Sequence, residues 1–420
     1  MKALFTIAAQ SAWNRRFVLS LVVLSIALSA FLLLGIERIR VDVRENFATS
    51  VSGTDLIVGA RTGAVQLLLY SVFHIGSASN NIKWSSAQAL ARNPAVAWTV
   101  PISLGDSHRS FSVVATTRTF FEHFRYGDRQ AVQLAQGHPF EGVFDAVLGS
   151  EVARRLRYES GDRLVLSHGD GVLTSNDHAD KPFTVVGVLQ PTGTPVDRSV
   201  FIGLDGMEAI HIDWIAGAPM PGLAVPADQV TNYDLNPKSI TALLVGLKSR
   251  AAVFSVQRAV AEFEGEPLMA VLPGVALDEL WDVVGIGERG LLVMSALVSL
   301  VSLAGLVAVI LTGLNERRRE LAILRAVGAG PRQVLVLLAI EGALITACGV
   351  LIGALAQIVA IVLLRGWMQA HFGIALQARP PSTNEFLLLA VVLIAGWLAS
   401  LLPGFRAYRL SISDGLSPRI

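Results

Sequence analysis

Histidines and aspartates near the middle of the chain are the first candidates for chemistry. The sequence SHGDGVLTSNDHADK, residues 167–181, groups five of them: His168, Asp170, Asp177, His178 and Asp180. Imidazole and carboxylate groups are common ligands of zinc and related metals. Their spacing here matches no metal motif, and a solvated polar hairpin tip has the same composition. We therefore expect a solvated hairpin and no bound metal.

Motifs for catalysis are missing from the sequence. A phosphate-binding loop needs a lysine in the pattern G-x-x-x-x-G-K-[ST]. The chain has five lysines, and none has that setting: Lys2, Lys83, Lys181, Lys238 and Lys248. The patterns H-E-x-x-H and G-x-S-x-G are also missing. We predict that the chain is not an enzyme and holds no cofactor of its own.

The densest group of charges lies in LNERRRELAILRAVGAGPRQV, residues 314–334, which holds five arginines: Arg317, Arg318, Arg319, Arg325 and Arg332. Residues 315–328 are good helix formers, and Leu321 and Leu324 share one face with Val327. Gly328 suits the left-handed backbone conformation that often ends an α-helix. Pro331 suits the first turn of a following helix. The pattern predicts a helix, a turn and a second helix.

Two functions remain open for this basic segment. The arginines can fix the orientation of neighbouring membrane spans and contact anionic lipid. Alternatively, the short helix can dock a cytoplasmic partner through an ordered mixture of basic, acidic and apolar side chains. The docking hypothesis assigns the contact to these residues: Glu316, Arg317, Arg318, Arg319, Glu320, Leu321, Leu324, Arg325 and Gly328.

The elements around that segment are long and apolar. The chain has 420 residues, of which 52% are hydrophobic and only 16% are charged, whereas soluble domains carry about 25% charged residues. Four runs are long enough to cross a bilayer, which takes about 20 apolar residues in a helix, and the last is the shortest: 17–36, 291–314, 335–364 and 386–402. The net charge of +1 gives no indication of nucleic-acid binding.

Basic residues in the short loops predict the orientation of the spans. The N-terminus, the arginine-rich loop and the C-terminal tail are expected to face the cytoplasm. The segment 38–285 and the loop 366–385 then lie outside, which for a bacterial inner membrane is the periplasm. The segment 38–285 mixes strand patterns, such as FTVVGVLQP (183–191), with helical ones, such as SAQALARN (86–93) and FDAVLGSEVARRLRY (144–158). Its pattern predicts an α+β domain.

These expectations define the domain organisation. We predict an α-helical membrane protein with four transmembrane helices and a large α+β periplasmic domain, with two subdomains, inserted between helices 1 and 2. The predicted segments are an amphipathic helix on the cytoplasmic face at 1–16, transmembrane helix 1 at 17–37, the periplasmic domain at 38–285, and transmembrane helices 2–4 within 286–420, including a coupling helix at 315–333 and a tail at 403–420.

The third span carries small residues and one acid. Gly342, Gly349 and Gly353 let helix backbones approach closely, either against a second chain or within this one. Glu341 lies near the cytoplasmic end of the span. A proton site is one reading of this acid, and a hydrogen-bonded structural role is the other.

Three motifs resemble the MacB/FtsX-type permeases of ABC transporters, a group that includes the lipoprotein-release permeases. They are ERRRELAILRAVGAGPRQV before span three, EGALITACGVLIGALAQIV within it, and LPGFRAYRLSISDGLS at the C-terminus. The layout of one span, a large domain and three spans is also similar. Pro331 and the stretch 205–235 depart from the family pattern.

The resemblance implies a function and partners. It favours the docking role for the basic segment, with a separate ABC ATPase dimer binding ATP and magnesium. It implies two permease chains, as a homodimer or heterodimer, in the bacterial inner membrane. ATP hydrolysis would then drive extraction or efflux of a lipoprotein, lipid, peptide or small molecule from the periplasmic side, with an adaptor or carrier protein as a further partner. The alternative is a scaffold that transports nothing and relays ATPase motion to a periplasmic partner such as a cell-wall hydrolase.

Overall fold

A computed structural model describes residues 16–76, 78, 80–169, 177–215, 218–219, 224–316, 328–372 and 379–409. The chain divides into two compact units. We call the first, residues 1–42, 285–368 and 376–420, the membrane unit. We call the second, residues 43–284 and 369–375, the sheet unit. The predicted amphipathic helix at 1–16 lies outside the described residues, except for Arg16.

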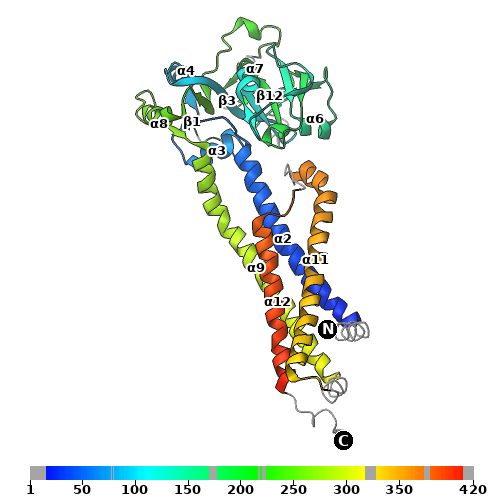
Figure 1. The fold of residues 1–420 in the computed structure, drawn as a ribbon. Helices are drawn as coiled ribbons and strands as arrows, with labels where there is room; N and C mark the ends of the chain where they lie inside the picture. Colours follow the sequence, from blue (N-terminus) through cyan, green and yellow to red (C-terminus); the bar gives the residue numbers. More distant parts are fainter. Residues whose placement is uncertain are drawn as a thin grey trace. The chain divides into compact units, whose positions relative to one another are not determined.

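The membrane unit is built on four long helices (Figure 1). They are α2 (Arg16–Thr49), α9 (Pro273–Glu316), α11 (Pro331–Phe372) and α12 (Thr383–Arg409). Each contains a stretch long and apolar enough to cross a membrane. The four predicted spans fall within them, one in each, which confirms the predicted fold class. Pro331 is the first residue of α11, as its missing donor allows.

The last helix is longer than its apolar run. α12 continues through Pro403 to Arg409, so it includes residues that we assigned to the tail. A proline interrupts one hydrogen bond of a helix but is tolerated in membrane helices, where neighbouring groups satisfy the freed carbonyl.

Contacts along the helices give their relative directions. Gly349 and Gly353 of α11 face Ile26 and Ala30 of α2, so these two helices run parallel. Gly342 and Gly396 face Ser400 and Thr346, respectively, so α11 and α12 run antiparallel. The serine hydroxyls of Ser25 and Ser302 are 2.9 Å apart, and those of Ser29 and Ser299 are 2.5 Å apart, so α2 and α9 are also antiparallel. This alternation is the one expected of four successive spans.

Strands dominate the sheet unit. The main described sheet has eleven strands, with a central order of β17-β1-β16-β3-β4-β12-β8-β11-β7, to which β10 and β9 add at β3 and β11. Its strands are β1 (Leu56–Ala60), β3 (Val96–His108), β4 (Phe111–Thr116), β7 (Leu134–Gly137), β8 (Asp145–Leu148), β9 (Arg163–Leu164), β10 (Ser167–His168), β11 (Phe183–Leu189), β12 (Ser199–Gly203), β16 (Ala242–Leu247) and β17 (Leu268–Val271). Short pairs complete the unit: β2 (Ile82–Lys83) with β15 (Ser239–Ile240), β5 (Arg125–Tyr126) with β6 (Gln130–Ala131), and β13 (Trp214–Ile215) with β14 (Ala218–Pro219).

Both faces of the main sheet are buried, because successive side chains of a strand point to opposite faces. In β1, Leu56 and Val58 belong to one hydrophobic cluster and Ile57 belongs to the other. In β12 the same alternation places Phe201 opposite to Val200 and Ile202. Two hydrophobic cores therefore share one sheet.

Different helices cover the two faces. The first core receives apolar side chains from α4 (Trp84–Ala91), α6 (Ser150–Leu156), α7 (Leu204–His211) and α8 (Val253–Ala261). The second receives them from α3 (Ala64–Ser71), α5 (Thr119–His123), the last residues of α2 and the first residues of α9. Short 3₁₀ turns lie at Pro195–Arg198, Val230–Asn232 and Arg250–Ala252. The eleven strands of the main sheet thus lie within one compact unit. The division of this domain into two subdomains stays a prediction.

The short helical pattern within 144–158 is confirmed as α6, which covers Ser150–Leu156. Asp145–Leu148, in the same stretch, form β8, a strand that we did not predict. Ala146, Val147 and Leu148 are all fully buried. A short apolar run of this kind has no periodicity that distinguishes a buried strand from a helix.

Candidate functional site

Most of the predicted docking segment lies outside the described residues. These are Arg317, Arg318, Arg319, Glu320, Leu321, Leu324 and Arg325. Glu316 is the last residue of α9. Gly328 follows with a φ of +103°, a backbone conformation that favours glycine. The role of this segment in coupling stays a prediction.

The predicted packing residues of span three contact other helices of the same chain. A side chain added at Gly349 would meet Ile26 Cγ2 at 2.7 Å, and one at Gly353 would meet Ala30 Cβ at 2.9 Å. Gly342 lies against Ser400. Of the two alternatives for these glycines, the described contacts are those of packing within the chain. Glu341 is buried, and its role stays a prediction.

Two ion pairs join α2 to residues 379–385 within the membrane unit, and the first of them is buried on both sides. Arg38 Nη1 is 3.4 Å from Glu385 Oε1, and both side chains are at most 5% exposed. Arg379 Nη2 is 3.0 Å from Asp42 Oδ1. Arg38 also donates a hydrogen bond to the carbonyl oxygen of Arg379. Buried charges are stable only when paired, so this arginine–carboxylate network fixes residues 38–42 of α2 against the segment 379–385.

In the sheet unit, the last turns of α2 and the first turns of α9 belong to the second core. Phe47 stacks on Phe73 with ring centroids 4.5 Å apart and meets the edge of Trp281 at 5.7 Å. Trp281 is 8% exposed, and Leu277 is 5% exposed. The guanidinium of Arg44 lies 5.8 Å from the Trp281 ring centre. These aromatic contacts attach both helix ends to the sheet.

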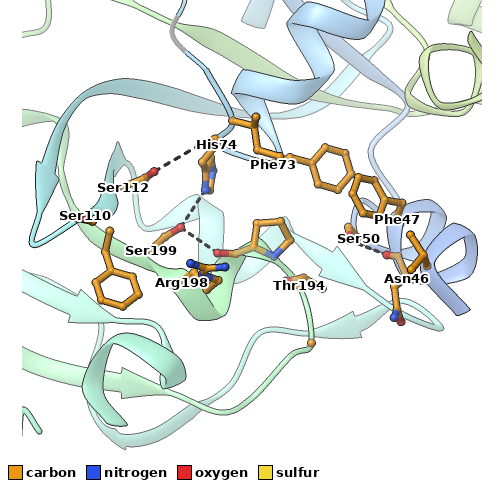
Figure 2. A pocket seen from close by; sticks show the side chains of 15 residues that line it. Asn46, Phe47, Ser50, Phe73, His74, Ser110, Ser112, Thr194, Arg198 and Ser199 are labelled. Carbon is orange, nitrogen blue, oxygen red and sulfur yellow. Dashed lines mark hydrogen bonds between the residues drawn. The ribbon is translucent and has the colours of Figure 1, made fainter. Parts of the chain in front are cut away.

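A cavity of about 330 Å³ lies beside the end of α2 in the sheet unit. Asn46 and Phe47 of α2 and the following Ser50 line it, together with His74, Ser112, Arg198 and Ser199 among others (Figure 2). His74 points at Ser199, with its Nδ1 2.9 Å from the hydroxyl oxygen. Burial lowers the pKa of His74 to about 4, so this ring is neutral at pH 7. The cavity is large enough for a small ligand or a side chain of a partner.

The histidine-rich stretch is divided by the fold. His168 and His178 come together, and Asp106 and His211 join them from β3 and α7. Asp177 instead accepts a hydrogen bond from Ser167 at 2.6 Å. Asp180 accepts one from Lys181, and Asp170 lies outside the described residues. The interpretation as a solvated hairpin is wrong for His178, whose side chain is fully buried.

Asp106 and His211 were not among the candidates from the sequence. They lie far from residues 167–181 along the chain, and β3 and α7 bring them to the stretch through tertiary structure. Asp106 sits next to a register irregularity between Leu104 and Ser107 in the β3–β4 pairing. An acidic residue inside a strand pattern is the one local signal that could have drawn attention to Asp106, because aspartate is depleted in strands.

The charges of this group are set by their surroundings. Burial would raise the pKa of Asp106, but hydrogen bonds with His168 and His211 and the nearby histidines hold it at about 2. Burial lowers the pKa of His178 to about 4. Burial also opposes protonation of His211, yet its hydrogen bond to Asp106 leaves its pKa raised. At pH 7 the carboxylate is charged and His178 is neutral.

Comparisons with known proteins agree with this architecture. A model of the MacB-like periplasmic core domain matches residues 19–263, and a model of the FtsX-like permease C-terminal region matches residues 292–412. No curated protein matches the chain. The periplasmic region of MacB from Actinobacillus actinomycetemcomitans is 13% identical with a TM-score of 0.33, over 55% of this chain and 94% of that one.

The extracellular domain of the noncanonical ABC-type transporter YknZ from Gram-positive bacteria is 10% identical, with a TM-score of 0.30, over 52% of this chain and 98% of that one. At such scores the assignment rests on the two family models, the first of which covers more than half of the chain. The chain therefore belongs to the MacB/FtsX-like family of ABC transporter permeases, multi-pass membrane proteins with a MacB-like periplasmic core domain.

Proposed function

We propose that this permease couples ATP hydrolysis by a separate ATPase to the extraction or efflux of a substrate on the periplasmic side of the bacterial inner membrane. The observation that carries the proposal is the continuity of α2 and α9. Each helix runs without a break from residues of the membrane unit to residues of the sheet unit. A displacement along either helix would therefore reach the sheet unit directly.

The length of α9 supports such transmission. Its 44 residues correspond to about 66 Å at the rise of an α-helix, roughly twice the thickness of the hydrocarbon core. The sheet unit joins its N-terminal end, and the arginine-rich segment follows its C-terminal end at Glu316. We infer that the ATPase docks on residues 316–328 in the cytoplasm, where it can pull or push on the ends of α9 and α11.

The cavity beside α2 supports a response on the periplasmic side. Three of its lining residues, Val43, Asn46 and Phe47, come from the last turns of α2, and Ser50 directly follows the helix. Movement of this helix end would change the shape of the cavity, and with it the binding of a substrate or partner protein.

The docking step is tested with the permease and its ATPase co-purified and reconstituted in proteoliposomes. Leu324→Asp alters the apolar face of the predicted helix and leaves every arginine in place, so a segment that only sets topology would tolerate it. We expect loss of ATPase binding and of ATPase stimulation. Arg332→Ala, which removes an exposed arginine at the start of α11, is the matched control and should leave both intact. Unchanged stimulation in Leu324→Asp contradicts docking at this helix.

The output of the complex is tested in the same vesicles. A transporter moves lipoprotein, lipid, peptide or small-molecule substrate to an acceptor in an ATP-dependent way. A transmembrane scaffold instead activates a periplasmic partner, such as a cell-wall hydrolase, without moving any substrate. Partner activation without substrate movement would replace the transport function by the scaffold function and leave the docking step unaffected.

A further inference from the structure

Four side chains that can bind a metal meet in the sheet unit, away from the cavity beside α2. Asp106 lies on β3, and His168 lies directly opposite to it on the paired strand β10. His178 follows Asp177, which bridges to Ser167 of β10. His211 is the last residue of α7. One possible ligand atom from each of the four lies within 4.8 Å of the others.

The separations of these atoms suit a tetrahedral ion. Zinc binds nitrogen and oxygen at about 2.0–2.1 Å, so neighbouring ligand atoms of a tetrahedral site lie about 3.3 Å apart. His168 Nδ1 is 2.9 Å from Asp106 Oδ1 and 3.1 Å from His211 Nε2. His211 Nε2 is 3.5 Å from Asp106 Oδ1, and His178 Nε2 is 3.8 Å from Asp106 Oδ2. The three distances among His168 Nδ1, His211 Nε2 and Asp106 Oδ1 fall on both sides of the tetrahedral value, and His178 Nε2 faces the second oxygen of the same carboxylate.

His178 provides an independent observation. Its side chain is fully buried, yet neither ring nitrogen has a hydrogen-bond partner among the described residues. Asp106 Oδ2, also buried, has none there either. Buried polar atoms are nearly always satisfied, and leaving them unsatisfied is costly. These unsatisfied atoms, in two side chains that face each other, mark a place where a bound cation would supply the missing interaction.

The surroundings orient the ligands. His211 Nδ1 lies 2.9 Å from the carbonyl oxygen of Met207, to which it donates, so Nε2 is left free to bind a metal. The Trp214 ring lies 4.3 Å from the His178 ring and 5.4 Å from the His168 ring, centre to centre. This indole restricts the histidine rings and lowers the polarity around them.

We propose that Asp106, His168, His178 and His211 form a tetrahedral zinc site. Three imidazoles and one carboxylate are a ligand set that zinc favours over magnesium or calcium, which prefer oxygen ligands. Four protein ligands leave no open position for a substrate, so the site is structural. The ion ties β3, β10, the segment at His178 and α7 together.

The test uses the full-length chain purified in detergent, stripped with a chelator and titrated with zinc chloride. We expect one zinc per chain by elemental analysis and a higher melting temperature with zinc than without it. Cobalt in place of zinc should give the intense visible bands of a tetrahedral nitrogen and oxygen site. A wild-type chain that neither retains zinc in a one-to-one ratio nor melts at a higher temperature with it overturns the proposal.

Variants assign the ligands. His168→Gln replaces a partly exposed ring, so it is the variant that disturbs the fold least. His178→Asn removes the buried ligand. Each should lower the zinc affinity at least about tenfold, because losing a group that only supports a metal ligand already lowers the affinity by about 10- to 100-fold. His138→Gln removes an exposed histidine of the same unit and should bind zinc as wild type does. If His178→Asn fails to fold, His168→Gln decides, since wild-type affinity and an unchanged cobalt spectrum would refute the ligand set.

Discussion

The membrane unit and the sheet unit bury their side chains in different ways. All five residues of β1 and of β12 are buried, because both faces of the sheet are covered. In the most apolar stretches of α2, α9, α11 and α12, only 39%, 28%, 28% and 22% of the residues are buried within the chain. The hydrophobic effect therefore drives packing in the sheet unit, whereas lipid offers the membrane helices an equally apolar surface.

This difference determines which contacts fix the arrangement of the elements in each unit. Close contacts of small residues and a few polar pairs must fix the arrangement of the membrane helices. In the sheet unit, buried polar groups are not needed for cohesion, so those that occur there are the stronger indication of a site. The predictions below compare matched changes in the two units, with the free energy of unfolding measured in detergent by denaturant titration.

The largest expected effect is the loss of one partner of the buried ion pair in the membrane unit. Glu385→Leu leaves Arg38 buried without its carboxylate and should cost about 3–5 kcal/mol. The control is Glu262→Leu in the sheet unit, whose partner Arg258 is 78% exposed, and it should cost no more than about 1 kcal/mol.

The double variant Arg38→Met with Glu385→Leu sharpens this result. It removes both charges and should recover all but about 1 kcal/mol, which reflects the bond from the Ser382 amide to Glu385. Equal losses of unfolding free energy for Glu385→Leu and Glu262→Leu would contradict the view that this buried pair fixes the arrangement of the membrane helices.

Close helix packing is the next largest effect. Gly353→Leu forces side-chain atoms into the backbone of α2 at Ala27 and Phe31 and should cost about 3 kcal/mol. Gly305 of α9 faces open space within the chain, and Gly305→Leu should cost little. If Gly305→Leu instead proves as damaging as Gly353→Leu, a second permease chain covers that face of α9 rather than lipid.

The same contrast explains what the sequence could predict. The four spans are visible because hydropathy is a property of contiguous residues, and a bilayer requires about 20 of them. The positions of Gly349 and Gly353 pointed to close packing, but a glycine pattern does not say which helix approaches it. That partner, α2, is known only from the contacts with Ile26 and Ala30.

In the sheet unit, a local pattern predicted β11 but not its neighbours. β11 pairs with β7 and β8, which precede it by long stretches of chain. The histidine stretch was visible in the sequence, but the side chains it meets were not, because Asp106 reaches it through the pairing of β3 with β10 and His211 reaches it from α7. Burial of His178 could not be predicted either, because its polar neighbours Asp177 and Asp180 indicate a solvated segment. In the structure Asp177 is partly buried and Asp180 is exposed.

An effect of pH should arise in the sheet unit. The pKa of His74 is lowered to about 4 by burial, against about 6.5 in the unfolded chain. The unfolded state then binds more protons below pH 6.5, so stability falls as the pH drops from 6.5 towards 4. His74 should account for a loss of roughly 2 kcal/mol between pH 7 and pH 5.

His74→Gln tests this assignment through the pH dependence alone, whatever its cost at pH 7. The variant should lose less stability than the wild type between pH 7 and pH 5. His138→Gln, at an exposed position, should follow the wild type. A His74→Gln profile parallel to that of the wild type would place the pH dependence elsewhere.

The smallest effect concerns single hydroxyl groups. Ser302→Ala removes the bond between α9 and Ser25 of α2 and should cost about 0.6 kcal/mol, the average for such bonds between membrane helices. Thr116→Val in the sheet unit leaves the buried carbonyl oxygen of Pro101, 2.7 Å from the Thr116 hydroxyl, without this donor and should cost about 1–3 kcal/mol. Thr312→Val is the control, because its hydroxyl donates to the carbonyl oxygen of Ala308 within α9 at an exposed position. In the folded sheet core no other donor replaces the lost hydroxyl, whereas separated membrane helices find other polar partners, which lowers the net value of a bond between them. A larger loss of unfolding free energy for Ser302→Ala than for Thr116→Val would therefore contradict this contrast between the two units.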